Sequence, residues 1–208
     1  ARLNAAFAAR DWNAMAELIA DDTTTDDRRP IVGLGLRRGR DAAIADWRVI
    51  AEVGVKNITM PTVIATRGER LALSRYQFAG RDQRPEAYRT EVLGVIEIDS
   101  DQRMKACVML DLDEIDSAFD ELEARYLAEL TPGCAHTWST IAEMFARVNR
   151  RDLPAAAPDV LNIDHRHTIK MTPGDLMDNI RAGVDVVPDI RVRVEAVHRI
   201  TAHGAVFT

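Results

Sequence analysis

The sequence predicts an α+β fold, and two observations carry this prediction. The first is the order of elements, because helical segments precede a run of strands. Apolar residues recur at helical spacing over residues 2–20, 40–53 and 113–129. Four segments between the last two helices are predicted to be strands, at 57–66, 70–80, 87–98 and 103–112. The second observation is that a similar order recurs further along the chain, which predicts two copies of one domain.

Each element of the first copy has its own local justification. The first helix carries an apolar stripe that includes Phe7 and Met15, and a short strand is predicted after it at about 23–28. The apolar face of the helix at 40–53 consists of Ile44, Trp47, Ile50 and Ala51. Hairpin turns are predicted at Arg67-Gly68-Glu69-Arg70 and Asp99-Ser100-Asp101. Acidic residues at the start of the helix at 113–129 agree with the helix dipole.

Self-comparison aligns residues 20–29 with residues 157–166, so that Asp27 matches Asp164 and Arg29 matches Arg166. The break at Thr131-Pro132-Gly133 separates two predicted domains, 1–131 and 135–208. The second copy is predicted to contain helices at 136–150 and 173–185 and strands at 160–166, 190–200 and from 205 onward. Counterparts of residues 74–112 are missing. We therefore expect the chain to be a piece of a larger protein, or another segment to complete the second sheet.

Composition excludes several classes of protein. Lys and Arg number 27 against 33 Asp and Glu, a net charge of -6, whereas a generic nucleic-acid binder is expected to be basic. No apolar run approaches the ~18–20 residues of a membrane span. The two cysteines, Cys107 and Cys134, make no disulfide framework in 208 residues. We therefore expect a reduced, cytoplasmic protein that binds neither nucleic acid nor membrane.

Several short segments resemble the SnoaL-like branch of the nuclear transport factor 2-like superfamily. They are Arg10-Asp11-Trp12, Asp21-Asp22, Asp26-Asp27-Arg28-Arg29-Pro30, Gly39-Arg40-Asp41-Ala42 and the stretch 111–119. The resemblance implies a cone in which helices and a bent antiparallel sheet enclose an apolar pocket. Some members are isomerases, polyketide cyclases or epoxide hydrolases, and many others only bind, dimerise or scaffold. Tandem modules of this kind often belong to large bacterial regulatory proteins, of an actinobacterial type.

The first candidate catalytic group is Arg89 and Glu91. Residues two apart on a strand share one face, so both can point into the cone. The resemblance implies that an epoxide hydrolase activates water with such an Arg–acid pair and a further acid. That further acid falls at Val108, which transfers no proton, so the set is incomplete. The alternative interpretation is a cross-strand ion pair.

Asp27 is the second catalytic candidate. The first copy contains no histidine, so its chemistry would depend on carboxylates, Arg and Tyr. Asp27 is a possible base, with Tyr76 or Tyr88 as the donor to an oxyanion, as in a ketosteroid-isomerase-like site. In the alternative, Asp26 and Asp27 form ion pairs with Arg28 and Arg29 at the rim of the sheet.

The candidate ligand-binding residues are Trp12, Trp47, Tyr76, Phe78 and Tyr88 in the first copy and Asp164 and Arg166 in the second. The aromatic residues either line a cavity or form plain core, and in a hollow fold both can hold. His165 and His167, with His198 or His203, raise the alternative of a metal site. An exposed polar strand explains these histidines as well, so we expect no metal and no cofactor.

These observations favour a pair of cone-shaped domains that bind a small apolar ligand or a protein surface and perform no chemistry. One alternative is an acid/base enzyme of the isomerase, cyclase or epoxide hydrolase type. The other is a dimerisation scaffold, a homo-oligomer that pairs through the outer faces of its sheets.

Overall fold

The computed structural model describes residues 2–30, 33–80, 89–152, 163, 173–187 and 190–208. The chain divides into two compact units. Unit 1 comprises Ala1–Leu130, Glu195–Arg199 and Val206–Thr208, and unit 2 comprises Thr131–Val194 and Ile200–Ala205.

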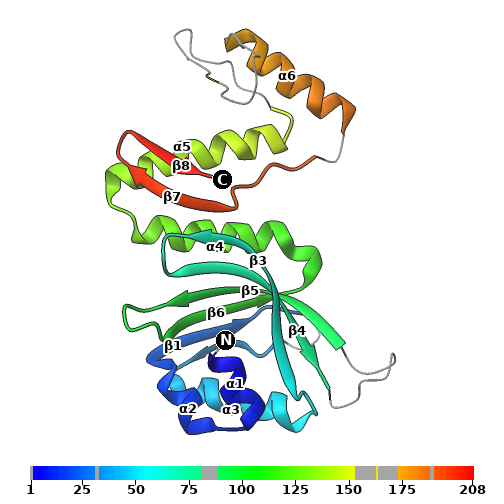
Figure 1. The fold of residues 1–208 in the computed structure, drawn as a ribbon, viewed down its shortest axis with the longest axis vertical. Coiled ribbons are helices and arrows are strands. Elements are labelled where there is room, and N and C mark those ends of the chain that lie inside the picture. The colour runs from blue at the N-terminus through cyan, green and yellow to red at the C-terminus, as the bar shows by residue number, and fades with distance from the viewer. Residues whose placement is uncertain (1, 31–32, 81–88, 153–162, 164–172, 188–189) are drawn as a thin grey trace. The chain divides into compact units, whose positions relative to one another are not determined.

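Three helices lie on one face of the sheet of unit 1: α1 (Arg2–Ala9), α2 (Trp12–Glu17) and α3 (Arg40–Glu52) (Figure 1). The predicted helix at 2–20 is therefore wrong in its extent. Arg10 adopts a φ of 58°, which an α-helix does not accommodate, and the carboxylate of Asp11 then caps α2 by accepting from the Ala14 amide at 3.0 Å. The chain leaves the helix at Leu18 and enters a strand.

Six strands form the main part of the sheet, in the order β2-β1-β6-β5-β4-β3. Their bounds are β1 (Ile19–Asp27), β2 (Gly35–Arg38), β3 (Asn57–Arg67), β4 (Leu71–Ala79), β5 (Arg89–Ile98) and β6 (Met104–Leu110). The pair β1–β6 is parallel, and the other neighbouring pairs are antiparallel. The last four strands lie where the sequence predicts them. β2 was not predicted, because its four residues have no apolar alternation and three of them are exposed.

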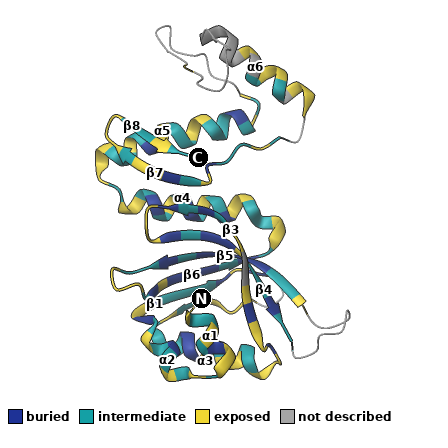
Figure 2. Ribbon diagram, viewed as in Figure 1, coloured by how far each residue is buried: buried dark blue, intermediate teal, exposed yellow. Residues whose placement is uncertain are grey.

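The register of the strands decides which side chains face the helices. Tyr76 is opposite Val92, Gly94 is opposite Met109, and Thr25 is opposite Cys107, so these residues share the concave face. Fully buried residues of the helices, among them Phe7 and Met15, pack in the same core cluster as Val92 and Cys107 (Figure 2). The helices and the concave face of the sheet thus form the first core of the unit.

The opposite face of the sheet is covered by α4 (Ile115–Glu129), which follows the short 3-10 helix η1 (Leu112–Glu114) (Figure 1). α4 buries Ala118, Leu122 and Tyr126 and contacts β3, β4 and β5. An ion pair adds to this packing, because Arg125 of α4 contacts Glu97 of β5 at 2.9 Å. α4 therefore covers part of the outer face that the scaffold alternative requires for pairing.

Two short strands continue the sheet beyond β3. They are β7 (Ala196–Thr201) and β8 (Gly204–Phe207), and β7 pairs with β3 in parallel through Thr66 and Ala196. The strand predicted at 190–200 therefore begins later than expected. Arg67, which is fully buried, donates to the backbone oxygen of Thr66 at 2.8 Å and to the carboxylate of Glu123.

Unit 2 contains α5 (Pro132–Asn149) and α6 (Pro173–Val186), close to two of the predicted helices. The amide of Asn149 bridges the backbone of Val192, donating to its oxygen at 2.9 Å and accepting from its nitrogen at 2.8 Å. The strand predicted at 160–166 lies outside the described residues apart from residue 163. Cys107 and Cys134 are both free.

Candidate functional site

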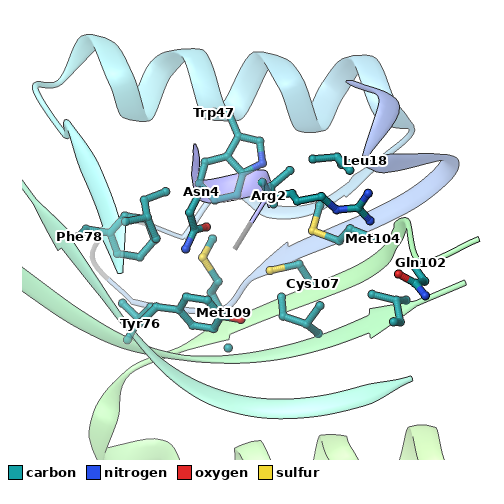
Figure 3. Close-up of a pocket in the computed structure, with 16 residues that line it drawn as sticks. Arg2, Asn4, Leu18, Trp47, Tyr76, Phe78, Gln102, Met104, Cys107 and Met109 are labelled. Atoms are coloured by element: carbon teal, nitrogen blue, oxygen red, sulfur yellow. The ribbon is translucent and has the colours of Figure 1, made fainter. Parts of the chain in front are cut away.

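Unit 1 contains a partly open cavity of about 300 Å³ between its helices and the concave face of its sheet. Its lining consists of Arg2, Leu3, Asn4, Leu18, Trp47, Ile58, Tyr76, Phe78, Val92, Gly94, Ile96, Ile98, Gln102, Met104, Cys107 and Met109. Figure 3 shows Tyr76 and Phe78 at one end of the cavity and Gln102 at the other, with Trp47 descending from α3. Most of these side chains are aliphatic, aromatic or sulfur-containing, which suits an apolar ligand.

The sheet forms the floor of the cavity through alternate residues of its strands. On β5 these are Val92, Gly94 and Ile96, and on β6 they include Cys107 and Met109. The residues between them lie on the opposite face of the sheet. This alternation of period two is why a strand in the middle of the sheet contributes to both cores.

Tyr76 and Cys107 are the titratable groups of this floor. Burial raises the pKa of the Tyr76 phenol far above its ordinary value, and the neighbouring Cys107 raises it further. Burial also raises the pKa of the Cys107 thiol to about 12, with a smaller contribution from the charge of Asp27. Both groups are therefore neutral at physiological pH, and the phenol remains a hydrogen-bond donor.

Four of the predicted aromatic residues can be placed. Trp47, Tyr76 and Phe78 line the cavity. Trp12 lies behind it, edge-on to Phe7 with 6.3 Å between ring centroids, and belongs to the supporting core. Tyr88 lies outside the described residues.

Asp27 is held by its neighbour Arg29 and is absent from the lining of the cavity. The guanidinium donates from Nε to Oδ1 at 2.8 Å and from Nη2 to Oδ2 at 2.6 Å, and the Arg29 amide also donates to Oδ1. Only 5% of Asp27 is exposed. Both carboxylate oxygens of Asp27 are thus occupied by charge-assisted hydrogen bonds from Arg29. This arrangement, together with the Asp26–Arg28 ion pair, matches the structural alternative for the two acids.

Arg89 and Glu91 share one face of β5, but it is the face away from the cavity. Glu91 is opposite Gln77 and Arg89 is opposite Ala79, on the same side as Leu73 and Val95. The expectation that both point into the cone is therefore wrong, because the register puts Val92 there. Arg89 is exposed, and Glu91 makes a cross-strand ion pair of 3.8 Å with Arg75. Val108, the position of the missing acid, faces the same outer side, opposite Val95.

The second-copy candidates Asp164 and Arg166, with His165 and His167, lie outside the described residues. His198 shares a hydrogen bond of 2.6 Å with the Thr208 hydroxyl. Within the part of the chain that the structure describes, no three His, Cys, Asp or Glu side chains come together as a metal site. The helices described there include none long and apolar enough to cross a membrane.

Sequence reasoning missed several cavity residues, notably Asn4, Gly94, Met104 and Met109. One signal was available for Gly94, because a glycine inside a strand pattern suggests that another group approaches closely. The sequence also shows that Cys107 and Met109, two residues apart, lie on the same face of their strand. It does not show which face of the sheet is concave.

A curved sheet with helices over its concave face and an apolar hollow between them defines a cone-shaped α+β domain of the nuclear transport factor 2-like type. The model of the SnoaL-like domain matches residues 1–106. The chain therefore belongs to the SnoaL-like family.

Several solved structures are similar to this chain at low sequence identity. A protein from Kribbella flavida is 13% identical, with a TM-score of 0.41, over 58% of this chain and 89% of that chain. A protein from Mycobacterium tuberculosis is 13% identical, with a TM-score of 0.44, over 54% and 90%. A nuclear transport factor 2-like protein of unknown function from Exiguobacterium is 13% identical, with a TM-score of 0.41, over 52% and 93%. None of the curated proteins matches the chain.

Proposed function

We propose that unit 1 binds a small, largely apolar molecule in its cavity and performs no chemistry on it. The observation that carries this proposal is the lining of the cavity, in which aromatic and aliphatic side chains surround a volume of about 300 Å³. Ligand sites in proteins are typically concave, mainly apolar and of this size or larger.

The geometry of the charged residues supports a binding role over acid/base catalysis. Among the described lining residues there is no carboxylate and no histidine. Asp27 is engaged by Arg29, and Glu91 lies on the outer face. General acid/base catalysis requires a proton acceptor within hydrogen-bond reach of the substrate, and the candidate acids do not satisfy this condition.

We also propose that residues 135–208 correspond to a second, incomplete copy of the domain. The internal sequence match and the helices α5 and α6 support this. Limited proteolysis tests this proposal. If the two domains fold separately, a protease should cleave at the Thr131-Pro132-Gly133 break and leave residues 1–130 intact.

Binding can be tested with the neutral apolar dye Nile red, whose fluorescence rises in an apolar site. Val92 is 1% exposed and lines the cavity, so Val92→Phe should fill part of it and weaken dye binding by about tenfold or more. The matched control is Val63→Phe, at a position on β3 that is 48% exposed. The control should bind as the wild type does. Equal binding by all three folded proteins, or no binding by the wild type, would contradict the proposal.

A further inference from the structure

The two ends of the cavity differ in polarity, and this difference bears on the chemical class of the ligand if the proposed function holds. Figure 3 shows Tyr76 and Phe78 at one end and Gln102 at the other, with the guanidinium of Arg2 extending from α1 toward the Gln102 end. Phe78 is 5% exposed, whereas Arg2 and Gln102 are both exposed residues. The cavity therefore has a buried apolar end and a polar end that solvent reaches.

The guanidinium of Arg2 supplies the charge at the polar end. Among the described residues that line the cavity, Arg2 is the charged one, and no carboxylate is present. None of the ion pairs within the described parts of the chain includes Arg2. A guanidinium presents a planar set of N–H donors that matches the two oxygens of a carboxylate. The polar end therefore suits an anionic group of a ligand.

Gln102 provides a second donor at the same end. It belongs to the turn between β5 and β6, where its backbone nitrogen donates to the backbone oxygen of Asp99 at 3.1 Å. Its φ of 62° lies in the left-handed region, which a hairpin turn usually fills with glycine or asparagine. The chain instead places a long amide side chain there, and this side chain lines the cavity. The turn thus presents a neutral N–H donor to a ligand group at the polar end.

The two acidic residues of this turn have a partner of their own. Arg103 contacts the carboxylate of Asp99 at 2.9 Å and that of Asp101 at 3.0 Å. The Asp99 carboxylate also accepts from the backbone nitrogens of Asp101 and Arg103, at 2.9 Å and 2.8 Å. Neither acid is therefore the counter-charge of Arg2, which stays available to a ligand.

The volume of the cavity sets the size of the apolar part of the ligand. A water-sized group occupies about 30 Å³, so a cavity of about 300 Å³ holds on the order of ten non-hydrogen atoms. The lining away from the polar end includes Trp47, Val92 and Phe78. An apolar body of this size can bury its carbon atoms against these side chains while a terminal group stays at Arg2.

We propose that the ligand is an amphipathic carboxylic acid, bound with its apolar body in the cavity and its carboxylate at the polar end. The guanidinium of Arg2 donates to the carboxylate oxygens, and the side-chain amide of Gln102 is the second donor. This assignment fixes the orientation of the ligand, because the carboxylate keeps its contact with water at the exposed end and the carbon atoms leave water at the buried end.

The test compares decanoate, decanol and decylamine, which share one alkyl chain, as competitors of Nile red below their micelle-forming concentrations. The wild type should bind decanoate about 3- to 10-fold more tightly than decanol, a modest gain because the Arg2 pair is exposed, and decylamine most weakly. The preference for decanoate should shrink between about 0.01 M and about 1 M salt, as the Debye length falls from about 30 Å to about 3 Å.

Three variants locate the head group. Arg2→Gln should abolish the preference for decanoate and leave the affinity for decanol within about twofold, and Arg2→Glu should make decylamine the tightest of the three. The matched control is Arg38→Gln, which makes the same change of net charge at an exposed position of β2 outside the cavity lining. The control should keep the full preference for decanoate.

Each contrary result has a distinct meaning. Decanoate binding no tighter than decanol, a preference that survives Arg2→Gln, or a preference lost equally in Arg38→Gln would overturn the carboxylate site while leaving an apolar binding cavity. Failure of both Nile red and decanol to bind the folded wild type would overturn the proposed function, and this inference with it.

Discussion

The ring of Tyr76 occupies the place where a side chain at Gly94 would stand: a Cβ atom there would lie 2.7 Å from Tyr76 Cε2. The two residues come from neighbouring strands and are diagonal to each other in the register. The absence of a side chain on β5 thus determines how an aromatic ring on β4 lies, and with it the shape of the cavity floor.

Gly94→Ala should destabilise the protein and reshape the cavity. The Tyr76 ring has to move away from the new methyl group, and overpacking of this kind costs about 1–3 kcal/mol of the free energy of unfolding. Urea unfolding measures this cost. Gly183→Ala in α6 is the control, because no atom lies within 4 Å of its Cβ position, and it should leave stability unchanged or slightly raised. Equal stability of both variants and the wild type would show that the position of the Tyr76 ring does not depend on the missing side chain at Gly94.

Asp27→Asn should weaken folding but not ligand binding. The substitution removes the carboxylate charge that pairs with the buried guanidinium of Arg29, and removing one partner of a buried pair costs about 3–5 kcal/mol. The dye affinity of the folded variant should stay within about twofold of the wild type. Asp26→Asn is the control, because its partner Arg28 is largely exposed and the pair contributes little. A folded Asp27→Asn protein that has lost dye binding would instead place Asp27 in the site.

The ion pairs that hold α4 predict a pH dependence of stability. Burial alone would raise the pKa of Glu97, but hydrogen bonds from Lys105 and Arg125 outweigh it and hold the pKa below its ordinary value. Because the folded-state pKa is depressed, the stabilisation is present above the ordinary carboxyl pKa of about 4.3 and is lost as the pH falls through the folded-state value.

Glu97→Gln should therefore lower the urea midpoint at neutral pH, and its difference from the wild type should narrow below about pH 4. Glu69→Gln, at an exposed position in the β3–β4 turn, serves as the control and should follow the wild type at every pH. A difference between Glu97→Gln and the wild type that stays constant over the whole pH range would show that the charge of Glu97 contributes nothing.

The two free thiols should react at different rates. Because burial raises the pKa of Cys107 to about 12, its thiolate is scarce at pH 8, and a thiol reagent should label it only after unfolding. Cys134 is partly exposed and should react in the folded protein. A thiol titration of the native wild type should then find one rapidly reacting thiol, and the native Cys134→Ser variant should have none. Two fast thiols in the native wild type would contradict the burial of Cys107.

Much of the fold follows from local patterns. The four strands from β3 to β6 and the helices α3 and α4 were predicted close to their observed positions, because alternation, hairpin turns and apolar stripes are properties of neighbouring residues. The first helix was predicted too long, because Leu3 to Ile19 keep an apolar periodicity across the turn at Arg10. β2 was not predicted because it forms a strand only by pairing with β1, from which a loop separates it.

Less of the candidate site could be predicted from the sequence. Trp47, Tyr76 and Phe78 were predicted because large aromatic residues in these elements have few other places to lie. Arg89 and Glu91 were correctly placed on one face of a strand, but the sequence does not say which face is concave when both faces are apolar in part. That choice depends on α4, which covers the outer face and leaves Val92, Gly94 and Ile96 to the cavity.

By itself, the sequence determined the α+β class and the family resemblance, since both depend on the order and spacing of residues along the chain. Only the tertiary structure decided that Asp27 is bound by Arg29, that Glu91 faces outward, and that Tyr76 lies over Gly94. The physical reason is that strand register and the side of the sheet that each helix covers are set by contacts between residues far apart in sequence. A shift of one residue in that register would exchange the two faces.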